Sequence, residues 1–565
     1  MLKYLGYDPE RVGPVYRFAA LGAAAVLTVV FLVIALIDGG WWWLLALVAL
    51  VLTAVGVSDV LQARHSILRN YPVLGHIRFF FEKIRPEIRQ YFIESDQDEE
   101  PFSREDRSIV YQRAKNEEAA RPFGTKQKVY EGGYAWMTHS IQPTHLDRRD
   151  FRVRIGGPDC KQPYDASLYN ISAMSFGSLS GAAVEAMNKG ALAGGFAHDT
   201  GEGGISRYHR QGGDLIWEIG SGYFGCRNNE TGRFDPGLFA SQAESPQVKM
   251  IELKLSQGAK PGHGGMLPAA KITEEIAEAR GVPMGQDCVS PAGHSEFSTP
   301  TELCEFIGEL RDLSHGKPVG FKLCIGHRRE FMCIVKAMLE TGIYPDFIVV
   351  DGTEGGTGAA PLEFANHVGM PLTEGLSFVH NVLRGADIRD RIRIGASGKL
   401  IHAFDIARAF ALGADWCNSA RGFMFAVGCI QAQACHTNHC PTGVTTQDPL
   451  RQRALVVPEK AERVANFHRN TMRALGEMTG AAGLEDPRDF LPYHFMKREG
   501  DGDMVEASDV WTYLPVGFLV RDVGFDDDVY RRRWNRASAM TFKPPEPVGR
   551  TQTRTDAGNS ARETE

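Results

Sequence analysis

The runs Ile392-Arg-Ile-Gly-Ala-Ser-Gly-Lys399 and Asp415-Trp-Cys-Asn-Ser-Ala-Arg-Gly422 are both strand-like, and both end in a turn of small residues beside a cation. A periodic helical stretch at Ile401–Leu412 lies between them. In a (β/α)8 barrel the loops after the seventh and eighth strands commonly bind a phosphate group. The two runs therefore predict the last strand–turn units of such a barrel and a phosphate cradle. Tight glycine turns without a ligand are the alternative.

Six earlier apolar runs continue the alternation toward the N-terminus. They lie at Leu168–Met174, Gly195–His198, Leu215–Ile219, Met250–Leu255, Val319–Cys324 and Phe347–Asp351. Periodic helices separate several of them, at Thr299–Leu313, Glu330–Thr341 and Leu372–Leu383. Eight strands interleaved with helices over roughly 260 residues predict an α/β fold, a (β/α)8 TIM barrel. The competing doubly wound sheet lacks its Gly-x-Gly-x-x-Gly turn after a first strand.

The N-terminal segment has a different composition. Phe18–Ile37 is uncharged and mostly apolar, and as a helix of about 30 Å it matches the hydrocarbon core of a bilayer. A turn at Asp38-Gly39-Gly40 and a second apolar run at Leu44–Val57 follow, so we expect a two-helix transmembrane hairpin. Basic residues flank both ends, which predicts a two-pass protein of the cell inner membrane with its large domain in the cytoplasm. The alternative, a signal peptide and a buried helix, lacks a cleavage site.

Aromatic and basic residues alternate from Ile77 to Phe92. This composition suits a helix on an anionic membrane surface, in contact with lipid, and equally a helix packed on the large domain. We predict five regions: the hairpin at 1–62, a juxtamembrane amphipathic segment and linker at 63–150, the barrel at 151–480, a C-terminal extension at 481–549 and a disordered tail at 550–565.

Charge and cysteine content narrow the classes of function. A net charge of −7 over 565 residues gives no general nucleic-acid footprint. Seven of the ten cysteines are scattered among apolar neighbours, which indicates a reducing compartment. Cys429, Cys435 and Cys440 instead follow a Cys-x5-Cys-x4-Cys spacing, and thiolates select iron–sulfur clusters or zinc. Three ligands favour a three-iron cluster, while core packing and a zinc site through His439 stay open.

The ends of the other predicted strands are polar and rich in glycine, for example at Ser172–Gly177 and Asp351–Gly358. Lys254 and Lys322 lie inside apolar strands, where a buried ammonium is costly unless it is paired. Glycines at strand ends let a flat ring approach the backbone, and cations stabilise an anionic ring. We therefore expect a flavin beside the sulfur-bound metal, and electron transfer between them.

These segments, in this order, resemble the FMN-binding synthase domain of the glutamate synthase family. The resemblance runs from about Tyr169 to Leu455. The motifs that carry it are Ser172–Gly177, Thr200–Gly204, Gln257–Gly262, Gly355–Ala359 and Cys429–Gln447. It implies a (β/α)8 barrel that carries FMN and a [3Fe-4S] cluster. The implied reaction is the reductive amination of 2-oxoglutarate, or a similar 2-oxo acid, to L-glutamate by an oxidoreductase that acts on CH–NH2 donors.

The resemblance also assigns roles to residues. It implies that the following residues hold FMN: Met174, Ser175, Lys254, Gln257, Lys322, Gly356, Thr357, Gly358, Gly398, Lys399, Arg421 and Gly422. Glu202, Lys260 and Arg280 are expected to be catalytic and to face the keto acid, whose two carboxylates suit cations. Cys429, Cys435 and Cys440 are expected to hold the cluster, which would relay single electrons to the flavin.

The chain departs from the family pattern at three points. Met266 replaces a glutamine expected near the keto acid, and His263 replaces an acidic residue in the same turn. No glutamine-hydrolysing domain precedes the barrel, so we expect ammonia or another amine to arrive free or from a partner. No dinucleotide fingerprint occurs, so an electron-donor protein is expected, either ferredoxin-like or an NAD(P)H-dependent reductase. The alternatives are an N-methylglutamate-type synthase and a membrane-bound flavin and iron–sulfur electron-transfer module without amination.

Overall fold

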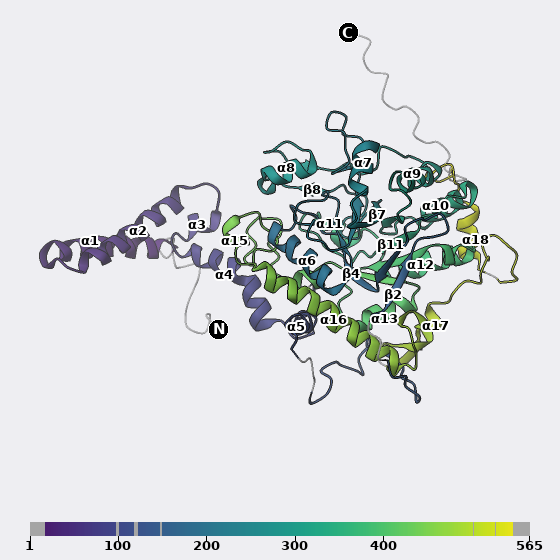
Figure 1. The fold of residues 1–565 in the computed structure, drawn as a ribbon. Helices are drawn as coiled ribbons and strands as arrows, with labels where there is room; N and C mark the ends of the chain where they lie inside the picture. Colours follow the sequence, from purple (N-terminus) through teal and green to yellow (C-terminus); the bar gives the residue numbers. More distant parts are fainter. Residues whose placement is uncertain are drawn as a thin grey trace, which may run out of the picture. The chain divides into compact units, whose positions relative to one another are not determined.

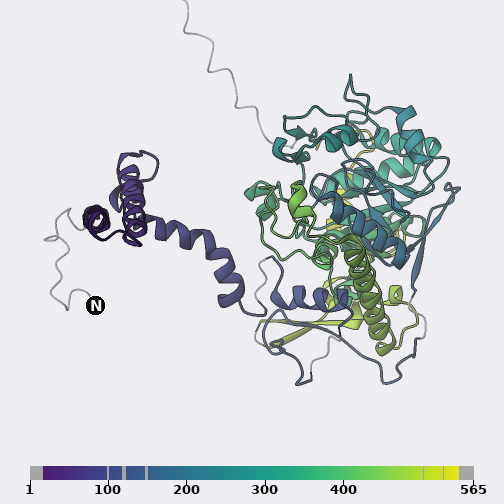
Figure 2. The ribbon, with the colours of Figure 1, turned by 60° about the vertical axis from the view of Figure 1, so that its left-hand side comes forward.

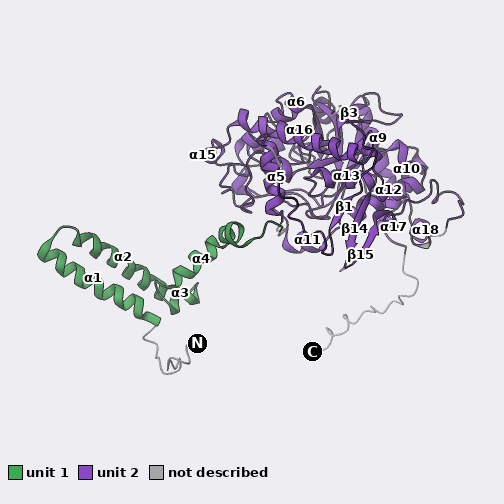
Figure 3. Cartoon of the chain, turned by 90° about the horizontal axis from the view of Figure 1, so that it is seen from below, with its two compact units in different colours: residues 1–98 green, residues 99–565 purple. Residues whose placement is uncertain are grey.

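A computed structural model of the chain describes residues 17–97, 101–117, 122–146, 150–500, 502–525 and 527–545. The chain divides into two compact units, Met1–Asp98 and Glu99–Glu565 (Figure 3). The tail predicted at 550–565 lies outside the described residues. The boundary between the units falls inside the segment predicted to be a linker.

The second unit is built on a closed barrel of eight parallel strands. In barrel order the strands are β4 (Tyr169–Ile171), β5 (His198–Asp199), β6 (Leu215–Ile219), β7 (Val248–Lys254), β10 (Val319–Leu323), β11 (Phe347–Asp351), β12 (Arg393–Ser397) and β13 (Trp416–Ser419). β13 pairs with β4 and closes the barrel. The predicted TIM barrel is confirmed, and each predicted run contains or overlaps one of these strands.

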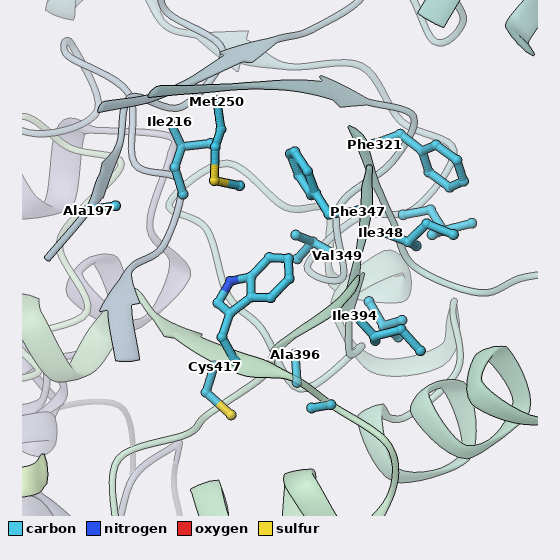
Figure 4. Close-up of a cluster of buried hydrophobic side chains, with 14 of the residues drawn as sticks. Ala197, Ile216, Met250, Phe321, Phe347, Ile348, Val349, Ile394, Ala396 and Cys417 are labelled. Atoms are coloured by element: carbon cyan, nitrogen blue, oxygen red, sulfur yellow. The ribbon is translucent and has the colours of Figure 1, made fainter. Parts of the chain in front are cut away.

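The strands are continuous apolar runs because both of their faces are buried, one inside the barrel and one under the helices. Figure 4 shows part of the resulting core, to which β6, β7, β10, β11, β12 and β13 all contribute. Phe321 and Phe347 are completely buried, and Phe347 packs edge-on against Trp416 with ring centroids 5.8 Å apart. This core fixes the strand ends, and with them the loops that follow.

Helices cover the barrel as the sequence predicts (Figure 1). The main ones are α6 (Gly181–Gly194), α7 (Pro236–Ala243), α9 (Pro300–Leu313), α10 (Arg328–Thr341), α12 (Leu372–Gly385), α13 (Ala403–Ala411) and α16 (Val457–Ala481). α9 starts where predicted because Thr299 and Glu302 form a capping box, in which each side chain accepts a backbone hydrogen bond. α10 begins two residues earlier than expected and α12 ends two residues later.

A segment before the barrel also belongs to the second unit. Helix α5 (Arg104–Ala114) packs against α16, beside which Figure 1 shows it, and against the short helix α14 (Arg421–Ala426). Figure 2 shows the same unit from another side. Nearby, β1 (Ala135–Met137), β14 (Phe495–Glu499) and β15 (Asp503–Glu506) form a small antiparallel sheet. Residues on both sides of the barrel sequence therefore wrap onto it.

The first unit is helical. α1 (Ala19–Asp38) and α2 (Trp42–Leu61) pack as a hairpin, and Thr28 Oγ1 lies 3.0 Å from Thr53 Oγ1 between them. By length and composition both helices are able to cross a membrane, and both expose large apolar side chains along their length. α3 (Ser66–Asn70), α4 (Gly75–Ile88) and a π-helix at Arg89–Ile93 follow.

Candidate active site

The carboxyl ends of the barrel strands converge on a cavity that brings together most of the predicted site residues. Its lining includes Met174, Ser175, Glu202, Lys254, Gln257, Lys260, Lys322, Gly356, Thr357, Gly358, Arg421 and Cys435. They come from the loops after five different strands, β4, β5, β7, β11 and β13, and from β10 itself. Active sites in this fold lie at the same end of the barrel.

A second cavity adjoins the first at the loops after β12 and β13. Gly398 and Lys399 line it together with serines at the ends of three strands, Ser172, Ser397 and Ser419. Lys322, Gly356 and Arg421 line both cavities, so the two lie side by side. Lys399 has a φ of 50°, a left-handed conformation that turns the chain sharply after β12. Three cations, Lys322, Lys399 and Arg421, line this second cavity with several hydroxyl groups and with the carboxylates of Asp351 and Glu354. That it binds a phosphate stays a prediction.

Glu202 and Lys254 form an ion pair inside the first cavity. Lys254 Nζ lies 3.2 Å from Glu202 Oε1, and it also donates a hydrogen bond to Gln257 Oε1 at 3.3 Å. Burial alone would raise the pKa of Glu202, but the positive charges of Lys254 and Arg280 outweigh it and lower that pKa below its ordinary value. Glu202 therefore stays ionised at neutral pH.

Lys260 is the unsatisfied cation of this cavity. The residue is only 2% exposed, and its Nζ atom has no hydrogen-bond partner among the described residues. Burial lowers its pKa, and the nearby Glu202 carboxylate opposes that shift. A buried ammonium without a partner is costly, so a bound anion would relieve the cost.

Lys322 lies in a group of buried charges inside the barrel. Its ammonium pairs closely with Glu218 and lies 3.4 Å from Glu252 Oε1. Burial would lower the pKa of Lys322, but these two carboxylates raise it well above the ordinary value. Burial, and then repulsion from Glu218, raises the pKa of Asp199 to about 7. This group therefore holds Lys322 charged at the floor of the cavity.

The same carboxylates have the geometry of a metal site, yet a lysine pairs with them. Among the described residues, Asp199, Glu218 and Glu252 form the one group of three His, Cys, Asp or Glu residues whose ligand atoms all lie within 4.8 Å of one another. Lys322 contacts two of the three, so its ammonium supplies the positive charge that a metal ion would otherwise supply.

The three predicted cluster cysteines lie in one loop that borders the cavity. Cys435 is part of the lining, and a Cβ added at Gly358 would lie 3.1 Å from its Cβ atom. Among the described residues, neither the three thiols nor the set Cys435, His439 and Cys440 forms a group of ligand atoms within 4.8 Å of one another. The zinc alternative therefore gains no support from the geometry. Burial would raise the pKa of the Cys440 thiol, but hydrogen bonds with Thr442 and Thr445 lower it to about 7.

Apart from Cys429 and Cys440, two predicted site residues lie outside both cavities. Arg280 is buried beneath the lining, where its Nη2 atom donates to Ser175 Oγ at 3.3 Å and to the Phe176 carbonyl at 3.1 Å. Arg280 thus holds the Ser175 side chain and the Phe176 backbone in position, and its direct contact with a keto acid stays a prediction. Gly422 faces the interior, since a Cβ there would lie 2.7 Å from Ser419 Oγ. Its φ is not left-handed, so packing explains the glycine.

The two departures from the family pattern have different positions. Met266 lines the cavity, so it can contact whatever binds there. His263 is outside the lining, and its ring packs against Phe364 with centroids 5.3 Å apart.

Sequence reasoning missed Glu218, Lys271 and Phe102. Glu218 is an acidic residue inside the apolar run Leu215–Ile219, and the argument that singled out Lys322 would also have found it. Lys271 is 3% exposed, lines the cavity near Cys435, and donates to the Ser178 carbonyl at 3.2 Å. No local signal marks Lys271 or Phe102.

The fold is that of the (β/α)8-barrel class, and the open end of this barrel gathers several lysines and an arginine. The family model described as "Conserved region in glutamate synthase" matches residues 160–485. The chain belongs to this glutamate synthase family, whose members are oxidoreductases that act on CH–NH2 donors.

Curated relatives agree with this assignment. A glutamate synthase large subunit-like protein of Bacillus subtilis (strain 168), YerD, is 40% identical over 496 residues, which cover 80% of this chain and 94% of that protein. The archaeal-type NADPH glutamate synthase of Thermotoga neapolitana is 35% identical over 315 residues, or 55% of this chain and 59% of that enzyme. The archaeal NADPH glutamate synthase of Methanocaldococcus jannaschii is 35% identical over 364 residues, which cover 64% of this chain and 67% of that enzyme.

Proposed function

We propose that the chain is an FMN- and [3Fe-4S]-dependent glutamate synthase-type oxidoreductase. It reductively aminates 2-oxoglutarate, or a close 2-oxo acid, to L-glutamate with electrons from an external donor. The observation that carries this proposal is the buried ammonium of Lys260, which has no hydrogen-bond partner among the described residues, in a cavity that adjoins the predicted anion site at Lys399 and Arg421.

The residues present fit FMN. An anionic phosphate suits the second cavity, where Lys399 and Arg421 meet the hydroxyl groups of strand-end serines. The cations Lys254 and Lys322 belong to the adjoining cavity, where an anionic reduced ring would be stabilised. Gly356 and Gly358 leave the wall between the two cavities thin, since a Cβ at Gly356 would lie 2.7 Å from Arg421 Nη2.

The residues also fit a three-iron cluster. The cysteine loop supplies three thiols within twelve residues, and one of them borders the cavity. Bound FMN would supply a hydride to the substrate carbon, and the bound cluster would supply the single electrons that reduce the flavin.

The substrate assignment rests on charge. Lys254 is neutralised by Glu202, and the Lys260 ammonium, which has no partner among the described residues, is available to receive a carboxylate. During the reaction the 2-oxo carbon loses its oxygen as water and gains nitrogen from ammonium and one hydride, while one proton is taken up to leave the product nitrogen as an ammonium group. Glu202 is ionised and within the same cavity, so it is suited to move a proton at the nitrogen atom.

A second candidate is an N-methylglutamate-type synthase that uses another amine. The observation that favours it is Met266, an apolar side chain in the cavity lining where the family pattern has a glutamine. A methyl group on the amine would find an apolar surface there. The third candidate, an electron-transfer module without amination, keeps both cofactors and forms no product.

Partners and location follow from the rest of the chain. The archaeal-type relatives are named for NADPH, which supports an NADPH-linked reductase as the donor, with a ferredoxin-like protein as the alternative. α1 and α2 support a two-pass inner-membrane protein with a cytoplasmic catalytic domain. The basic and aromatic side chains of α4 and the following π-helix support contact with anionic lipid.

The test is anaerobic purification of the full chain in detergent, followed by optical and electron-spin spectra and product analysis. We expect a flavin spectrum, a three-iron signal that Cys435→Ser removes and Cys160→Ser keeps, and glutamate from 2-oxoglutarate and ammonium. Faster turnover with methylammonium would select the second candidate. Reducible cofactors without any amine product would select the third candidate, the electron-transfer module. A colourless protein would contradict all three candidate functions.

A further inference from the structure

The segment Pro101–Ala114, here called the clamp segment, lies outside the matched family region at 160–485. Even so, it forms part of the cofactor site. Pro101 and Phe102 line the second cavity together with Gly398, Lys399 and Arg421. A wall of the predicted phosphate site is thus supplied by the stretch that directly follows the first unit in sequence, and not by the barrel.

Phe102 is the central residue of this wall. It is 4% exposed, and its ring packs edge-on against Phe425, with centroids 5.3 Å apart at an interplanar angle of 88°. Lys399 Nζ lies 5.5 Å from the centroid of the same ring, within the range of a cation–π contact. The Phe102 ring therefore contacts Lys399, one of the cations expected to bind the phosphate.

The clamp segment also contacts the cysteine loop. The Phe102 carbonyl accepts a hydrogen bond from Gln431 Nε2 at 3.1 Å, and the Tyr111 hydroxyl donates to the Cys429 carbonyl at 2.7 Å. Both partners lie at the start of the loop that carries the three thiols. One short segment thus contacts the predicted phosphate site and the predicted cluster site.

Two further contacts fix the clamp segment in place. Ser103 caps α5, since its hydroxyl accepts from the Asp106 backbone and the Asp106 side chain accepts from the Ser103 backbone. The other carboxylate oxygen of Asp106 lies 2.5 Å from His402 Nε2, three residues after Lys399. Asp106 therefore joins the start of α5 to His402, just after the predicted phosphate turn.

We propose that the clamp segment closes the phosphate end of the flavin site, and that Phe102 is a cofactor-positioning residue that the barrel itself lacks. The apolar ring excludes water beside Lys399, and in a less polar surrounding the attraction between an ammonium and a phosphate is stronger. This inference rests on the proposed binding of FMN and adds a further residue to that site.

The test compares two flavins on the full-length protein in detergent, after the bound flavin has been removed. Riboflavin lacks the phosphate, so a residue that acts at the phosphate end affects FMN alone. We expect Phe102→Ala to raise the Kd for FMN by about tenfold or more and to leave the Kd for riboflavin unchanged. Phe102→Leu, which keeps most of the packing, serves as the milder variant. Phe123→Ala removes a fully exposed ring of the same region and serves as the matched control.

The outcomes separate this inference from the function on which it rests. If the unmutated protein binds neither flavin, the proposed function fails. If the unmutated protein binds FMN and both Phe102 variants bind it equally well, the proposed role of the clamp segment is overturned and the proposed function stands. An equal rise in the Kd for FMN and the Kd for riboflavin would also overturn the proposed role of Phe102, because the substitution would then disturb the whole flavin site and not its phosphate end.

Discussion

Lys254 Nζ and Glu202 Oε1 lie 3.2 Å apart across the mouth of the barrel, the lysine at the end of β7 and the carboxylate in the loop after β5. The pair is neutral as a whole, so Lys260, Lys271 and Arg421 leave the lining of the cavity with a positive charge. Replacing either member changes both the charge of the cavity and the position of its partner.

We expect Glu202→Gln to lower kcat by about a hundredfold or more, the usual contribution of a positioned proton-transfer group. The KM for 2-oxoglutarate is expected to fall at the same time, because the cavity gains positive charge. Steady-state kinetics with a chemical reductant as donor would measure both changes. Glu275→Gln, at a partly exposed carboxylate, is the control. An unchanged kcat would show that Glu202 only holds Lys254 in position.

Lys322→Met is expected to destabilise the barrel by about 3–5 kcal/mol, because it leaves Glu218 and Glu252 buried without their cation. Lys249→Met removes a lysine from the half-exposed pair with Asp214 and is expected to cost about 0–1 kcal/mol. Urea unfolding of both variants would measure the difference. Adding Glu218→Gln to Lys322→Met should recover part of the loss; no recovery would mean that the lysine acts through packing alone.

The Asp106–His402 pair predicts a pH-dependent clamp. Burial would lower the pKa of His402, but its hydrogen bond with Asp106 raises it above the ordinary value. Burial would raise the pKa of Asp106, but the hydrogen bond and charge of His402 lower it. The stabilisation from His402 is therefore complete below about pH 6.5 and lost as the pH rises through its raised pKa. The stabilisation from Asp106 is present above about pH 4 and lost as the pH falls through its lowered pKa.

The expected result is that FMN is retained best between these two limits, and that His402→Gln flattens the profile on the alkaline side. Flavin fluorescence released during dialysis at a series of pH values would measure this retention. His367→Gln, on the short helix at Leu362–His367, is the matched histidine control. Identical profiles for the His402 variant and the unmutated protein would contradict the prediction.

The N-terminal hairpin predicts firm membrane attachment. We expect the full chain to stay with the membrane fraction after an alkaline carbonate wash, and a variant lacking residues 19–61 to be released. Exposed apolar side chains along both helices are the physical reason, because each would meet water outside a bilayer. A full-length chain that washes off would show that the helices do not span the bilayer.

The barrel could be predicted from the sequence because each of its strands is a short apolar run, and because polar, glycine-rich turns follow them at one end. That regularity also predicts that Lys254, Lys260 and Lys399 lie at the same end of the barrel. Helix ends were predicted to within a few residues where a capping box such as Thr299 and Glu302 marks them.

The contacts that complete the site could not be predicted in this way. Tyr111 meets Cys429 across 318 residues of sequence, and Phe102 meets Gln431 across 329. Neither pair carries a local pattern. Gly258 is a further case: a Cβ there would lie 1.8 Å from the Gly352 carbonyl oxygen, so the glycine is required by a backbone contact between two loops.

The lysine and carboxylates inside the barrel have a consequence for substrate traffic. Lys322 and the carboxylates of Glu218, Glu252 and Asp199 occupy the inside of the barrel, which in this fold is a packed core and not a pore. Under the proposed function, the nitrogen source and the oxo acid therefore enter at the same end of the barrel at which the amino acid leaves. A ligand bound at that end is expected to compete with both reactants.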